Sequence, residues 1–119
     1  MERIQVINIQ LPAGVGAGQL REIPLLVDTD YKRITGMAFH QLADGGVANN
    51  YNVGFRTDRK QWVDPININN WNANTGVAIE DKFREVDIPV HVNDIGYAMI
   101  VPGALTTGDL IGQLVLMLE

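Results

Sequence analysis

The C-terminal end of the chain constrains the fold most, because two apolar runs lie there with glycine and proline between them. The runs span residues 95–101 and 110–119, and residues 102–109 join them. Both runs are rich in leucine or in residues that favour strands, and they are too short to form a pair of packed helices. The pattern therefore predicts a hairpin of two buried strands.

The last run places apolar side chains on both faces of its predicted strand. One face carries Leu110, Leu114, Leu116 and Leu118, and the other carries Ile111, Val115 and Met117. A strand with one face in water would alternate apolar with polar residues, so we expect both faces to be covered. We expect a second sheet on one face and another subunit on the other, with Ile111, Val115 and Met117 as the oligomer interface.

The remainder of the chain also has the pattern of strands. Apolar residues alternate with polar ones over residues 51–56 and 83–92, and no helical period competes with them. The chain has room for about eight strands at spacings of roughly 8 to 12 residues. We predict an all-β fold, a two-sheet antiparallel sandwich formed by a single domain over residues 1–119. A jelly roll is the first choice and an immunoglobulin-like sandwich the second.

Details of three strands can also be predicted. The first run has Ile4 and Val6 on one face and Ile7 and Ile9 on the other, which predicts a bulge near Val6 or burial of both faces. Residues 34–42 place Ile34 with Ala38, His40 and Leu42, opposite Met37 and Phe39. Pro24 and Pro89 lie within strand patterns, where a missing backbone donor indicates an edge strand or a bulge.

Composition limits the partners that we expect. The net charge is -5, the isoelectric point is about 4.8 and the nine basic residues are scattered, so we expect no direct contact with nucleic acid. The chain has no cysteine, which excludes disulfides and thiolate metal sites. Charges stand where a signal peptide needs an apolar run, and no stretch approaches the roughly 18 apolar residues of a membrane helix. We therefore expect a soluble protein, made in the cytoplasm, without a membrane partner.

Few residues could carry catalysis or hold a cofactor. The chain has no serine and no cysteine, which excludes those two nucleophiles. His40 and His91 lie in different predicted strands without the spacing of a metal site; we expect a hydrogen-bonded core position for His40 and a surface pair with Asp94 for His91. Gly14, Gly16 and Gly18 lack the pattern of a phosphate-binding loop and predict a flexible connection. We expect no enzyme activity, no cofactor and no metal.

An asparagine-rich segment offers an alternative function. Amides and aromatic rings are the groups that bind sugars, so a carbohydrate-binding module is the alternative hypothesis. Asparagine also tolerates tight turns, which is the simpler interpretation of this segment. The residues that would bind a glycan are Asn67, Asn69, Trp71, Asn72 and Asn74.

The pattern as a whole resembles the small β-sandwich and jelly-roll proteins of virus and phage particles. The resemblance lies in the N-terminal strand, the strand-turn-strand pattern of residues 28–39 and the closing run of residues 112–119. It implies a non-enzymatic structural subunit located in the virion, such as a capsid, penton or decoration component. Its partners would be further copies of itself and other virion proteins. The resemblance assigns no role to any individual residue.

Overall fold

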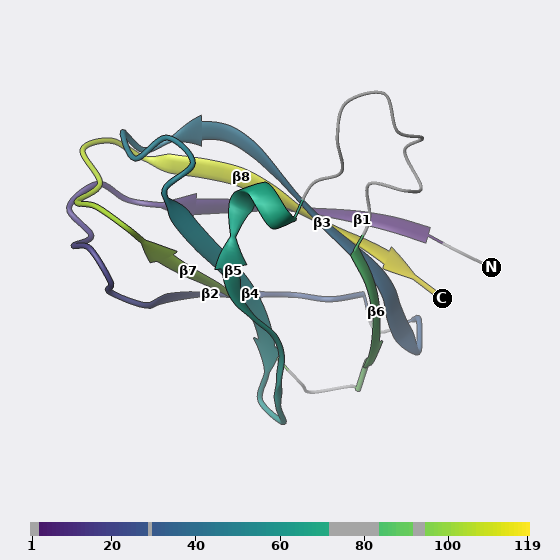
Figure 1. Cartoon of the computed structure of the whole chain (residues 1–119). Helices are drawn as coiled ribbons and strands as arrows, with labels where there is room; N and C mark the ends of the chain where they lie inside the picture. The colour runs from purple at the N-terminus through teal and green to yellow at the C-terminus, as the bar shows by residue number, and fades with distance from the viewer. Residues whose placement is uncertain (1–2, 29, 72–83, 92–94) are drawn as a thin grey trace.

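The computed structural model describes residues 3–28, 30–71, 84–91 and 95–119. In this part of the chain the backbone forms strands and one short 3-10 helix, η1 (Figure 1). The strands are β1 (Arg3–Leu11), β2 (Arg21–Leu25), β3 (Arg33–Asp44), β4 (Tyr51–Thr57), β5 (Gln61–Asn67), β6 (Arg84–Pro89), β7 (Gly96–Pro102) and β8 (Leu110–Leu118). The helix η1 spans Ile68–Asn70 and follows β5 directly. Residues 77–80, for which the sequence also predicts a short strand, lie outside the described residues.

The strands form two four-stranded antiparallel sheets, which confirms the predicted two-sheet sandwich. Sheet A has the order β1-β8-β3-β6 and sheet B the order β2-β7-β4-β5. The pairs β1-β8, β2-β7, β3-β6 and β4-β5 are nested, so the first half of the chain runs beside the second half as in one long hairpin. Successive strands along this hairpin are divided between the two sheets.

The predicted hairpin of the two C-terminal runs is wrong. The strands themselves are present as β7 and β8, but β7 pairs with β2 and β4 in sheet B, whereas β8 pairs with β1 and β3 in sheet A. Residues 103–109 therefore cross from one sheet to the other. Apolar periodicity shows that a segment is a buried strand, but it does not identify the strand's partners.

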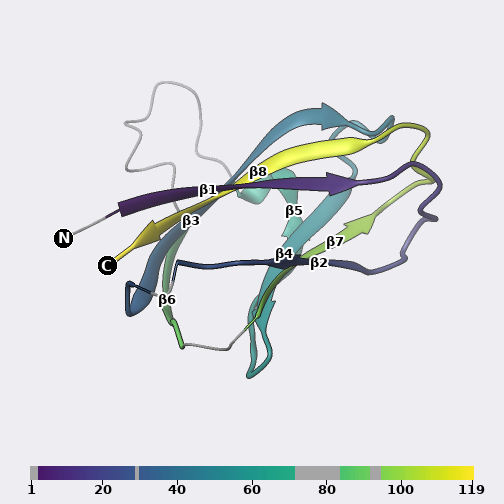
Figure 2. The same cartoon turned by 180° about the vertical axis from the view of Figure 1, so that it is seen from behind.

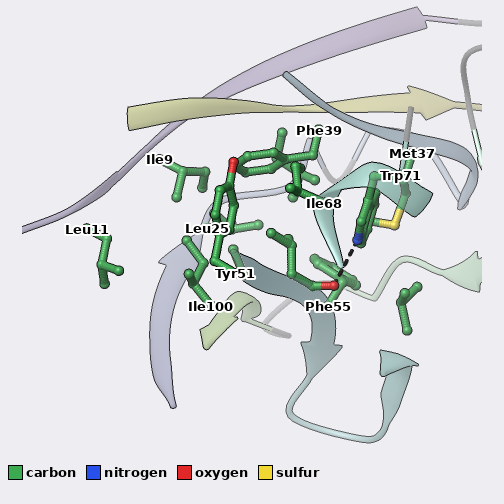
Figure 3. Close-up of a cluster of buried hydrophobic side chains, with 14 of the residues drawn as sticks. Ile9, Leu11, Leu25, Met37, Phe39, Tyr51, Phe55, Ile68, Trp71 and Ile100 are labelled. Carbon is green, nitrogen blue, oxygen red and sulfur yellow. Dashed lines mark hydrogen bonds between the residues drawn. The ribbon is translucent and has the colours of Figure 1, made fainter. Parts of the chain in front are cut away.

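The core lies between the inner faces of the two sheets (Figure 3). Phe39 of sheet A meets Tyr51 of sheet B edge to face, with ring centroids 6.3 Å apart. The hydroxyl of Tyr51 donates a hydrogen bond of 2.6 Å to Oε1 of Gln41, so the polar end of this buried ring has a partner. The four inward leucines of β8 are fully buried, as their alternation predicts: Leu110, Leu114, Leu116 and Leu118.

Two of the predicted face assignments need correction. β1 pairs with β8 in regular register over its whole length, and Ile4 and Val6 are each 52% exposed; the strand has neither a bulge nor two buried faces. In β3 the register shifts between Ile34 and Gly36. This bulge turns Ile34 into the core beside Met37 and away from the face that simple alternation predicts for it.

Candidate interaction surface

The outer face of sheet A carries adjoining apolar side chains on three neighbouring strands. In the register of the sheet, Ile4 lies opposite Met117, and Val115 lies between Val6 and Ala38. Ile4 and Val6 are about half exposed, and the other three are partly buried by their neighbours on the strands. We call these five residues the outer apolar face: Ile4, Val6, Ala38, Val115 and Met117.

A polar row borders the outer apolar face. Gln113 of β8 lies between Asn8 of β1 and His40 of β3, and its Nε2 donates a hydrogen bond of 3.3 Å to Oδ1 of Asn8. Beyond this row lie Ile111 and the 56% exposed Leu42, which sits in a second bulge of β3. Of the three residues predicted as an interface, Val115 and Met117 therefore belong to the outer apolar face, while Ile111 is separated from them by the polar row.

The outer face of sheet B has a different chemical character. The guanidinium of Arg56 lies 4.1 Å from the centroid of the Tyr97 ring and forms an ion pair with Glu22. The hydrogen bonds that the Arg56 guanidinium donates to the Glu22 carboxylate raise the pKa of Arg56. Neighbouring Met99 is 3% exposed. Side chains on this face thus interact with one another, whereas Ile4, Val6 and Leu42 of sheet A face solvent.

A groove opens between the edge strands β5 and β6, on the side of the sandwich opposite β1. It encloses about 470 Å³ and is lined by Trp62, Val63, Asp64, Ile66, Glu85, Val86, Asp87 and Ile88. Asp87 pairs with Arg33 at 2.8 Å, and Asp64 accepts a hydrogen bond of 2.6 Å from Gln61. Within the described residues, no group of three histidine or acidic side chains is placed to hold a metal ion.

The predicted glycan-binding segment has its aromatic ring inside the protein. Trp71 is 2% exposed, and its Nε1 donates a hydrogen bond of 2.8 Å to the carbonyl of Val53 (Figure 3). Asn67 caps η1 by accepting from the amide of Asn69, and its own amide donates to the carbonyl of Asn49. A buried ring cannot stack on a sugar, so this arrangement does not favour the carbohydrate hypothesis. Asn72 and Asn74 lie outside the described residues.

Two other predicted details have structural answers. The glycine-rich loop after β1 is hydrogen-bonded to the β7–β8 connection and to the end of β7. Gly14 N donates to the Thr106 carbonyl and Gly18 N to the Pro102 carbonyl, both at 2.8 Å. These two amides are therefore occupied and do not cradle a phosphate.

His40 is exposed on the outer face of sheet A, which contradicts its predicted core position. His91 is exposed as expected, but Asp94 lies outside the described residues.

Sequence reasoning missed the contribution of β1 to this surface. The alternation of Ile4 and Val6 with Ile7 and Ile9 is visible in the sequence, but it is equally compatible with burial on both faces. The strand has Arg3 at its start and glutamine or asparagine at Gln5, Asn8 and Gln10, so its polar residues do not mark one face as wet. Strand order is needed to show that β1 lies at an edge beside the apolar outer residues of β8.

No family model matches this chain, and no curated protein or solved structure does so either. None of the helical segments in the part of the chain that the structure describes has the length and apolar character needed to cross a membrane.

Proposed function

We propose that this protein is a non-enzymatic structural subunit of a homo-oligomeric assembly, and that the assembly is a virus or phage particle in which it serves as a capsid, penton or decoration component. The observation that carries the proposal is the outer apolar face of sheet A. Aliphatic side chains gathered on one outer face are typical of interaction surfaces rather than of the scattered apolar residues of a monomer.

The strand topology supports the viral part of the proposal. We propose that the sandwich is a jelly roll, since its eight strands form nested antiparallel pairs that are wound between two sheets. In an immunoglobulin-like sandwich most pairs would join strands that are neighbours in sequence, whereas here β4-β5 is the one such pair in the described sheets. Jelly rolls are frequent in viral capsid proteins and also occur in lectins and cupins, so the topology alone does not decide the function.

The contrast between the two outer faces favours sheet A as the contact surface. On sheet B, Arg56 is already engaged with Glu22 and Tyr97, and a partner would have to compete with these interactions. On sheet A, Val6 and Val115 offer apolar surface that another molecule can remove from water. Burying apolar surface contributes a favourable free energy of about 25 cal/mol per Å². Covering this face by further copies is the expectation for a self-assembling subunit.

The test is the mass of the protein in solution. Size-exclusion chromatography with light scattering at about 100 μM should give a stable oligomer, since association depends on concentration by mass action. Val115→Asp should shift the mass toward that of the monomer, because a carboxylate would be buried without a partner. Leu105→Asp is the matched control: Leu105 is 58% exposed in the β7–β8 connection, and this variant should keep the oligomer. A wild-type protein that remains strictly monomeric would overturn the proposal.

A further inference from the structure

The four edge strands of the sandwich differ in how well they are protected against pairing with another strand. Edge strands expose unpaired backbone groups, and proline, bulges and short length are the usual protections. β2 has five residues and contains Pro24. β5 contains Pro65 and has register shifts against β4, and β6 ends at Pro89 and has a register shift against β3.

β1 has none of these protections. It is nine residues long, contains no proline and follows β8 in unbroken register from Arg3 to Leu11. In Figure 2 it runs along the near side of the molecule as an extended strand. β8 is its one strand partner in the described sheets, and the backbone hydrogen bonds described outside the strand ladders include none to β1.

The side chains of β1, and not its backbone edge, make the contacts with the segment that follows β2. The amide of Gln5 donates to the Leu26 carbonyl at 2.9 Å and accepts from the Asp28 amide at 3.0 Å. Arg3 forms an ion pair of 2.7 Å with Asp28. These contacts hold β1 in an extended conformation beside the segment after β2, so a partner strand would meet an edge that is already ordered.

We propose that β1 pairs antiparallel with β1 of a second copy across a two-fold axis, which joins the two A sheets into one continuous sheet of eight strands. This inference rests on the proposed function and specifies one contact between two subunits of the proposed oligomer. A two-fold interface brings the same surface of both subunits together, so the surface must not repel itself. Arg3 is the one charged residue of β1, and it lies at the start of the strand. If the two-fold axis lies near the middle of β1, the Arg3 residues of the two copies are far apart and do not face each other.

The side chains of β1 also suit such a pair. If the axis lies at Ile7, Val6 of one copy stands opposite Asn8 of the other, and Ile4 stands opposite Gln10. The pairs Ile4–Gln10, Gln5–Ile9 and Val6–Asn8 then each combine an apolar with a neutral polar residue, Ile7 faces its own copy and Arg3 faces Leu11. Like charges, which destabilise opposed positions, are therefore avoided. Val6 of one copy then also lies diagonally across from Val6 of the other, so the two outer apolar faces adjoin at that point.

Disulfide trapping tests this arrangement directly, because the chain has no cysteine of its own. Opposed residues of antiparallel strands have Cα atoms about 4.5 or 5.5 Å apart. This separation lies within the roughly 4.4–6.8 Å range of disulfides. Val6→Cys and Asn8→Cys change exposed side chains and should leave the fold intact. The two variants are oxidised separately and as a mixture, with Leu105→Cys as the exposed control.

The expected result is a covalent dimer in the mixture of Val6→Cys and Asn8→Cys. If the axis lies at residue 6 or residue 8, the variant at that residue should form the covalent dimer by itself. Leu105→Cys should form little covalent dimer. The variant Asn8→Lys should also weaken the dimer, because Asn8 of each copy lies diagonally across the axis from its counterpart and two lysines there repel one another. Asn8 lies outside the outer apolar face, so an oligomer that yields no β1 cross-link and tolerates this lysine would overturn the inference while leaving the proposed function standing. A wild-type monomer would overturn both.

Discussion

Trp71 shows how the position of a single side chain decides between two functions. As a ligand-binding residue it would need an exposed face, but the ring is buried against Ile68 and the core, and its nitrogen is bonded to the Val53 carbonyl (Figure 3). Its role is therefore to anchor the segment after β5 to β4. The sequence could not show this, because asparagines on both sides of a tryptophan are equally typical of a binding loop and of a capped turn.

Replacing Trp71 should therefore change stability strongly. Trp71→Ala is expected to lower the free energy of unfolding by about 3–5 kcal/mol, the usual cost of removing a large buried aromatic side chain. Urea denaturation followed by circular dichroism measures the change. Trp62→Ala is the matched control: Trp62 is partly exposed under Lys60, and its loss should cost clearly less. Equal effects of the two substitutions would contradict this assignment.

At the scale of elements, the contact between β4 and β5 depends on the absence of a side chain. A Cβ atom built on Gly54 would lie 2.6 Å from the carbonyl oxygen of Val63 and 2.8 Å from the nitrogen of Pro65. These are backbone atoms of β5 at a register shift, so they cannot move aside as the end of a flexible side chain could. The close approach of the irregular edge strand β5 to β4 thus requires glycine at this position.

Gly54→Ala should cost about 1–3 kcal/mol or more, as overpacking usually does, because β5 must shift away from β4. Gly108→Ala offers a control within the same chain: no atom lies within 4 Å of its added Cβ, and its backbone does not have a positive φ that favours glycine. That substitution should be neutral or stabilise by up to about 1 kcal/mol through the unfolded state. Thermal unfolding of the two variants measures the difference, and a Gly54→Ala protein as stable as the wild type would show that β5 is free to move.

The elements themselves were largely predictable, but their neighbours were not. Alternation identifies the inward residues of β4 and of β8 correctly, because a period of two is a property of the strand alone. It assigns Ile34 to the wrong face, because a bulge adds one residue to the strand. Residues before and after the bulge then alternate out of step, so counting across it places one group on the wrong face. The β7–β8 hairpin is wrong because sheet pairing depends on contacts between distant segments. The interface prediction places Val115 and Met117 on the outward face but misses Ile4 and Val6, which adjoin them only after β1 pairs with β8.

At the scale of the whole molecule, charge and apolar surface are separated. Residues 4–11 of β1 and 110–118 of β8 contain no charged side chain, whereas the chain as a whole carries a net charge of -5. An assembly held through β1 and the outer apolar face therefore brings neutral surfaces together, while the remaining charges of its subunits repel one another over longer distances.

Salt should consequently strengthen the assembly. Raising the ionic strength from about 0.01 M to about 1 M shortens the screening length from roughly 30 Å to 3 Å, which weakens the repulsion between subunits but leaves apolar contacts and backbone hydrogen bonds in place. Sedimentation equilibrium across this range should show the association constant rising with salt. An interface built from ion pairs would respond in the opposite direction, because screening weakens attraction between opposite charges as well. Dissociation at high salt would therefore place the contact on a charged surface, away from β1 and the outer apolar face.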